Sequence, residues 1–94
     1  MLLKRMLIIN PADNVGVVME DVLKGDEVAM DDKMVVALEG IEFAHKIVLR
    51  DLVPGEEIIK YGESIGYAMK HIKKGEWIHN HNLDCERARN GRLV

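Results

Sequence analysis

Short apolar segments rich in Val and Ile recur along the chain, and turn-forming residues separate them. Four of these segments have the length of β-strands: residues 14–20, 34–38, 45–50 and 64–69. Alternation of side chains is cleanest in residues 45–50, and no segment sustains a helical period over about 11 residues. The pattern predicts a compact all-β domain of short twisted strands, with room for one brief helical turn around residues 40–44.

One motif occurs three times, as an apolar residue, two spacers, Gly, an acidic residue, a spacer and a β-branched residue. Its copies occupy residues 21–28, 51–58 and 71–78. The glycines, Gly25, Gly55 and Gly75, are 30 and then 20 residues apart, which excludes a fixed-period solenoid. Pro54 fits the second position of a type II turn and Gly55 the third. Each copy therefore predicts a strand, a tight turn and a second strand.

A length of 94 residues predicts a single domain, with a core over residues 6–83 and a charged tail over residues 84–94. The net charge of −3 argues against nucleic acid or an anionic membrane as a partner. No apolar run is long enough for a membrane span or an export signal, and the lone Cys85 cannot form an internal disulfide. These features predict a soluble cytoplasmic protein.

The strongest candidates for chemistry, His79 and His81, directly follow the third motif copy. If the strand continues through Asn82, the two imidazoles lie on one face, roughly 6.5–7 Å apart at the Cβ atoms. Two imidazoles at that spacing can share a metal ion or bind one carboxylate. The alternative is a pair of exposed histidines at a strand end. Asn82 would lie on the opposite face or bind backbone groups.

Two further candidates, Lys60 and Tyr61, follow the second motif copy. They offer an ammonium and a phenol to an anionic substrate, or they are a solvated Lys and a half-buried Tyr. His45 lies on the apolar face of its segment, where a structural role is expected. Trp77 shares a face with His79 and is the edge of a binding surface or a core anchor.

Four motifs in this order resemble the N-terminal module of the altronate/galactarate dehydratase family. They are residues 11–15 (PADNV), 44–51 (AHKIVLRD), 55–66 (GEEIIKYGESIG) and 72–83 (IKKGEWIHNHNL). Trp77 departs from the pattern, since the family often has His there. The resemblance covers most of the chain and implies a SAF-type β-clip fold, in agreement with the all-β prediction.

The resemblance also implies a function. Enzymes of the family dehydrate sugar acids with divalent iron or manganese, and most of their catalytic machinery lies in a larger C-terminal part. A chain of this length resembles the separate small subunit of a two-chain enzyme, inactive alone and completed by a large subunit that binds most of the metal. His79 and His81 are then catalytic or metal-binding residues, and Lys60, Tyr61 and Asn82 contact the substrate.

Two alternatives to this function remain open. The chain also resembles the small subunit of sulfolactate sulfo-lyase, so the substrate and its leaving group are not decided by the motifs. A SAF-type domain can also be a non-catalytic module that binds a ligand or assembles with a partner.

Overall fold

The computed structural model describes residues 3–79 and 81–84, and within them it contains β-strands but no helix. The strands are β1 (Lys4–Leu7), β2 (Val15–Val18), β3 (Glu27–Met30), β4 (Lys33–Val36), β5 (Lys46–Val48), β6 (Glu57–Lys60), β7 (Glu63–Ala68), β8 (Trp77–Ile78) and β9 (Leu83–Asp84). The all-β prediction is confirmed. None of the described residues forms a helix of the length and apolar character needed to cross a membrane.

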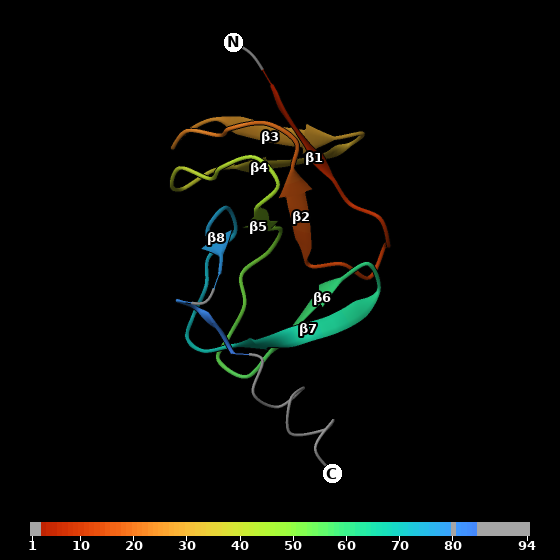
Figure 1. Ribbon diagram of the computed structural model, residues 1–94, viewed down its shortest axis with the longest axis vertical. Helices are drawn as coiled ribbons and strands as arrows, with labels where there is room; N and C mark the ends of the chain where they lie inside the picture. Colours follow the sequence, from red (N-terminus) through yellow and green to blue (C-terminus); the bar gives the residue numbers. More distant parts are fainter. Residues whose placement is uncertain (1–2, 80, 85–94) are drawn as a thin grey trace.

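The strands form two sheets. The larger has the order β4-β3-β1-β2-β5-β8, and the smaller has the order β6-β7-β9. Within these sheets β1 and β3 pair in parallel, whereas the other pairs are antiparallel. Figure 1 shows β1, β3 and β4 at one end of the molecule and the β6–β7 hairpin at the other. Strands β2, β5 and β8 lie between these ends and connect them.

Two hydrophobic clusters fill this frame because each sheet turns its apolar side chains inward. The first is enclosed by the curled larger sheet and includes Met6, Val18, Val28 and Ile47. The second is covered by the hairpin and consists of Val15, Val48, Leu52, Ile58, Ala68, Ile72 and Ile78. Strand β5 contributes to both clusters, since neighbouring side chains of a strand point to opposite faces.

The three predicted tight turns are present. Gly25, Gly55 and Gly75 have φ of 93°, 87° and 96°, a conformation that glycine adopts without steric cost. In each turn the acidic side chain accepts a hydrogen bond from the backbone N–H three residues earlier. These bonds are Leu23 to Asp26 (2.9 Å), Val53 to Glu56 (3.0 Å) and Lys73 to Glu76 (2.7 Å). The motif thus encodes a turn closed by its own side chain.

The strand predicted before each turn was wrong. Val22 and Ile41 form one isolated bridge, and Leu52 and Ile72 form another. A single bridged residue buries one apolar side chain and then enters the turn, so no ladder develops. Residues 40–44 likewise form this bridge and a tight turn in place of a helical turn.

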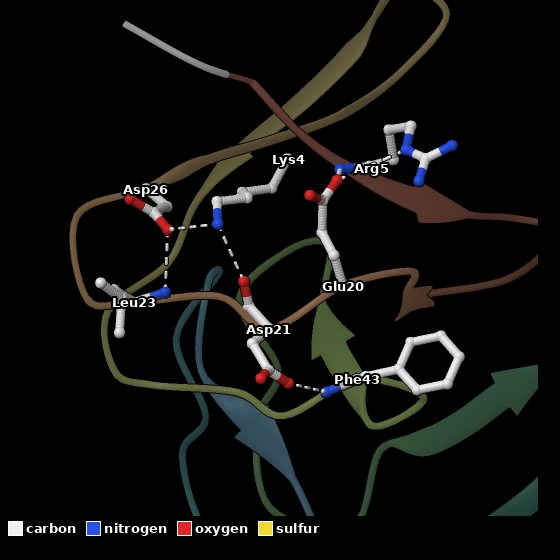
Figure 2. A network of polar contacts seen from close by, with 7 residues as sticks. All are labelled: Lys4, Arg5, Glu20, Asp21, Leu23, Asp26 and Phe43. Carbon is white, nitrogen blue, oxygen red and sulfur yellow. Dashed lines mark hydrogen bonds and ion pairs between the residues drawn. The ribbon is translucent and has the colours of Figure 1, made fainter.

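Aspartates that precede the bridges link the turns in pairs, as Figure 2 shows for the first pair. Asp21 accepts a hydrogen bond from the backbone N–H of Phe43 (2.9 Å), and Lys4 donates to the Asp21 carbonyl (3.0 Å). Asp51 accepts in the same way from the backbone N–H of Lys74 (2.8 Å). The two halves of the chain therefore hold paired turns together by the same interaction, an aspartate side chain that accepts from a backbone N–H of the partner turn.

The prediction that the third strand continues through residue 82 was also wrong, because β8 ends at Ile78 and a turn follows. The backbone N–H of Asn82 donates to the His79 carbonyl (3.0 Å), and the Asn82 side chain accepts from the His79 N–H (2.9 Å). This repeats the acid-closed turn with an amide in the acid position. Strand alternation therefore does not relate His79 to His81.

Strands β1 and β9 were not predicted. The β1 segment lacks the alternation of a half-buried strand, and two residues of β9 are too few to show a pattern. Of the predicted tail, Asp84 belongs to β9, while residues 85–94, Cys85 among them, lie outside the described residues.

Candidate functional site

Three imidazoles gather around the indole of Trp77. The ring of His79 stacks on it with a centroid distance of 5.1 Å, and the ring of His81 lies tilted at the same distance. His45 meets the indole edge to face at 5.7 Å and lies 5.9 Å from the His79 ring. We call His45, Trp77, His79 and His81 the imidazole cluster.

Three elements bring these side chains together. His45 immediately precedes β5, and Trp77 opens β8, which pairs with β5 so that Ile47 lies opposite Trp77. His79 and His81 belong to the turn that follows β8. The predicted proximity of His79 to Trp77 is thus found, but through a turn and not along a strand, and the same turn brings His81 to the indole.

The side chain of Asn82 closes this turn from inside. It has no exposed surface, its oxygen accepts from the His79 N–H, and its amide nitrogen donates to the Trp77 carbonyl at 2.8 Å. Asn82 was predicted to contact the substrate or to bind the backbone, and the structure shows the backbone contacts. The two hydrogen bonds of its side chain hold the backbone of the turn that carries His79 and His81.

The backbone N–H of Trp77 donates to the Glu39 carboxylate at 3.0 Å. The indole packs against the first hydrophobic cluster, and its Nε1 is buried with no hydrogen-bond partner in the described part of the chain. The expectation that Trp77 anchors the core is confirmed, and its alternative role as the edge of a binding surface stays a prediction.

His79 and His81 are exposed, whereas His45 is partly buried. The Nδ1 of His45 lies 3.3 Å from the carbonyl oxygens of Glu42 and Phe43. Because carbonyl oxygens only accept, a neutral His45 ring carries its proton on Nδ1 and leaves Nε2 as the basic nitrogen. The cluster therefore presents the imidazoles of His79 and His81 to solvent, with the His45 ring beside them.

The described residues around the cluster do not make a complete metal centre. Among residues 3–79 and 81–84, no three His, Cys, Asp or Glu side chains are arranged to hold a metal ion. A stable protein site for a divalent metal normally needs three or more such ligands. His79 and His81, the two residues predicted to bind a metal, can supply only part of such a site.

The other predicted residues, Lys60 and Tyr61, lie at the end of β6. Tyr61 has a positive φ of 57°, and the Lys60 Nζ lies 4.6 Å from the centroid of its ring. Burial lowers the pKa of a second lysine, Lys46 in β5, and the nearby Lys60 ammonium lowers it further. Lys46 directly follows His45 in the chain and is not among the residues predicted for the site.

A cleft of about 510 Å³ opens elsewhere on the surface. Its polar lining includes Asp13, Asp32, Lys33, Arg50 and Lys74, and none of the predicted site residues borders it. The cations and carboxylates of the lining largely offset each other in charge. The cleft therefore lends no support to the predicted site.

Comparison with known proteins places the domain in a family. A family model described as the altronate/galactarate dehydratase SAF domain matches residues 4–86. The chain belongs to this family. The four motifs and the imidazole cluster all lie within the matched residues of the SAF domain.

Similar proteins include whole enzymes and a small subunit. The chain is 39% identical over 74 residues to altronate dehydratase of Escherichia coli, covering 79% of the chain and 15% of that relative. To altronate dehydratase of Bacillus subtilis it is 34% identical over 80 residues, covering 85% and 16%. To the (2R)-sulfolactate sulfo-lyase subunit alpha of Chromohalobacter salexigens it is 33% identical over 82 residues, covering 80% and 87%.

These relatives are dehydratases and a sulfo-lyase, so the SAF domain is related to enzymes that catalyse elimination. The chain spans 15–16% of the length of the altronate dehydratases. It spans most of the sulfo-lyase subunit, whose name makes it one chain of a multi-subunit enzyme.

Proposed function

We propose that this chain is the small subunit of a two-chain sugar-acid dehydratase and contributes the imidazole cluster to an active site completed by a large subunit. The observation that carries the proposal is the gathering of His45, His79 and His81 on Trp77, in a domain whose relatives are dehydratases. Two of these imidazoles are exposed, as groups that serve a site shared with another chain must be.

The chemistry of dehydration suits imidazoles. A base removes the proton from the carbon next to the carboxylate, the bond from the neighbouring carbon to its hydroxyl oxygen breaks, and an acid protonates that oxygen. Water leaves and a carbon–carbon double bond forms. In this proposal His79 and His81 are the groups that take or donate a proton, because an imidazole can do both near neutral pH.

His45 has a different part in the proposal. Its Nδ1 is directed to backbone carbonyls, and its ring borders both Trp77 and His79. It therefore acts as a positioning residue that limits how the His79 ring can turn. A divalent metal, if the enzyme uses one, is assigned to the large subunit, since the described residues of this chain do not assemble a metal site.

Co-production with a large lyase chain tests the proposal. The mixture is expected to convert altronate or galactarate, and neither chain alone should do so. His79→Ala and His81→Ala should each lower kcat by about 10²–10⁴-fold, the usual contribution of a general acid or base. His71→Ala is the matched control, because His71 is exposed and lies outside the cluster. Wild-type rates in both cluster variants would overturn the assignment of the site.

A sulfo-lyase is the second candidate, favoured by the 87% of the sulfolactate sulfo-lyase subunit that the chain covers. The same mixture supplied with (2R)-sulfolactate separates the two enzymes, since turnover of this substrate alone identifies a sulfo-lyase. A chain that binds a ligand or a protein and activates no large chain is a non-catalytic module, and this result excludes both enzymes.

A further inference from the structure

Strand β4 is an edge strand of the larger sheet, since β3 is the one strand of the described chain that pairs with it. The backbone N–H of Ala37 donates to the Asp26 carbonyl, in the direction of β3. The backbone N–H of Leu38 donates to the Gly75 carbonyl, on the opposite side. Successive residues of a strand direct their backbone groups to alternate sides. Met34, four residues before Leu38, therefore directs its N–H and C=O away from β3, to the free edge.

The third tight turn covers one end of this edge and leaves the other end open. Gly75 accepts from the backbone N–H of Leu38 and donates its own N–H to the Val48 carbonyl of β5, both at 2.9 Å. The chain then continues into β8, which pairs with β5 and not with β4. No described residue outside β3 forms a hydrogen bond with the backbone of Met34. The turn therefore joins β4 to β5 at Gly75, and the edge at Met34 is left without a neighbouring strand.

The cleft of about 510 Å³ opens beside this edge. It is lined by residues 33–35 of β4 and by Leu49 and Arg50, which follow β5. Its apolar lining includes Ile8 and Val35 of the first hydrophobic cluster, and Leu49, which packs against that cluster. One strand residue occupies roughly 160 Å³, from a rise of about 3.3 Å, a strand spacing of about 4.8 Å and a sheet spacing of about 10 Å. The cleft therefore has room for about three residues of extended chain.

The β6–β7 hairpin repeats the hydrogen bonds of the β3–β4 hairpin. In each half of the chain, the N–H of the turn glycine donates at 2.8 Å to the carbonyl of an alanine at the end of the hairpin, Ala37 or Ala68. The residue that follows the alanine, Leu38 or Met69, donates its backbone N–H to a later turn. Strand β7 is therefore the counterpart of β4, and its side away from β6 is the counterpart of the free edge.

That side of β7 is covered by β9. Strand β9 pairs antiparallel with Tyr67 and Ala68 of β7, and the Leu83 side chain packs against the second hydrophobic cluster. A Cβ at Gly66 would lie 2.7 Å from the Asp84 carbonyl oxygen, so the backbone of β9 comes close to that of β7. The domain itself thus shows what fits such an edge, which is an extended segment with an apolar side chain turned to the core.

The charges of the cleft favour an occupant without net charge. The lining carries two aspartates and two lysines, and its one arginine, Arg50, forms an ion pair with Glu56. Because these charges offset each other, a strongly charged ligand gains little from the field of the cleft. An apolar segment whose polar groups are those of its backbone matches both the lining and the free edge.

We infer that the free edge of β4 and the cleft beside it bind an extended, uncharged apolar segment of a partner polypeptide by strand addition. The backbone of the segment pairs with the N–H and C=O of Met34. One of its apolar side chains packs against the first hydrophobic cluster, as Leu83 of β9 packs against the second. Assignment of the segment to the large chain rests on the proposed function, whereas the docking site itself requires only the free edge and the cleft.

A short peptide tests the inference on the 94-residue chain alone. The probe is acetyl-Thr-Leu-Thr-Val-Thr-amide, which is uncharged and has apolar side chains at alternate positions, and its titration is followed by NMR of the isotope-labelled chain. Binding should shift the backbone amide signals of residues 33–35, 49 and 50 and slow hydrogen exchange at the Met34 N–H. The same peptide with methylated backbone nitrogens cannot donate hydrogen bonds, so its Kd should be higher by at least about tenfold.

Two variants at one position keep the test decisive. Met34→Pro removes the N–H that faces the free edge and leaves the hydrogen bonds between β3 and β4 in place, because an edge strand tolerates proline where its N–H points outward. Met34→Leu is the matched control, since it keeps this N–H. The Kd of the peptide should rise at least about tenfold in Met34→Pro and stay within about twofold of wild type in Met34→Leu. Equal binding by the two variants, or no binding by wild type, would overturn the inference. Equal affinity for the methylated peptide would do the same without any change to the protein.

Other results would identify a different occupant. If sedimentation shows that wild type is a dimer and Met34→Pro a monomer, the edge pairs with a second copy, and the inference of a partner chain is wrong. In co-production with the large lyase chain, Met34→Pro should recover less of that chain than Met34→Leu, and equal recovery would overturn the assignment to the large chain. Failure of the dehydratase proposal would leave binding of the peptide unaffected, so the two failures are distinguishable.

Discussion

Replacing Asn82 by Ala removes the side chain whose hydrogen bonds hold the turn of the imidazole cluster. The side chain is fully buried and makes two hydrogen bonds, one with the backbone N–H of His79 and one with the carbonyl of Trp77. Truncation leaves a donor and an acceptor without partners. Each buried group left in that state costs about 1–3 kcal/mol, and His79 is near enough to water to recover part of its loss. We therefore expect a loss of about 2–4 kcal/mol.

This loss is large for a domain of 94 residues. At 0.05–0.15 kcal/mol per residue, the whole free energy of unfolding is about 5–14 kcal/mol. The change corresponds to a fall in Tm of about 10–30 °C for a domain of this size. Urea unfolding followed by circular dichroism measures it, and Trp77, the one tryptophan of the sequence, reports the environment of the cluster by fluorescence.

Two further substitutions test the reasoning. Asn82→Asp keeps the acceptor for His79 but faces the Trp77 carbonyl with an oxygen, so it should not restore stability at neutral pH. Asp26→Ala removes the equivalent bond from an exposed turn, where water replaces it, and should cost at most about 1.5 kcal/mol. The reasoning is refuted if the free energy of unfolding of Asn82→Ala lies within about 0.5 kcal/mol of the wild-type value, or if that of Asn82→Asp equals it. The two hydrogen bonds would then not hold the turn.

Two other predictions concern the repeated turns. Gly75→Ala should lower the free energy of unfolding by several kcal/mol, because the residue has a φ of 96° and its Cβ would overlap a carbonyl oxygen of β4. Gly25→Ala should lower it only by the backbone strain of about 1–2 kcal/mol, because Gly25 has a similar φ of 93° but open space around it. Equal urea midpoints for the two variants would contradict this. The backbone N–H of Val53 and then Arg50 lower the pKa of Glu56, so its stabilisation is complete above its ordinary value of 4.5 and is lost as pH falls through the folded pKa. As pH is lowered from 6 to 3, the urea midpoint should fall less steeply in Glu56→Gln than in wild type. Parallel profiles for the two proteins would refute the assignment.

The sequence predicted the local features of the fold because short-range chemistry controls them. A glycine before an acidic residue specifies a turn through the positive φ of the glycine and a side-chain hydrogen bond that spans three residues. At residue 82 the same short-range rule does not apply in an obvious way, because Asn takes the place of the acid that closes the other turns. An amide that closes a turn gives no signal distinct from an amide on a strand.

The sequence alone determined an all-β chain with tight turns at Gly25, Gly55 and Gly75 and the motifs of a SAF domain. These properties depend on residues that are close together along the chain. Only the tertiary structure decided which distant residues meet: His45 with Trp77 across the β5–β8 pair, and Asn14 with Ile59 of β6. Such contacts follow from strand register, and register is set by the burial of apolar faces drawn from the whole chain.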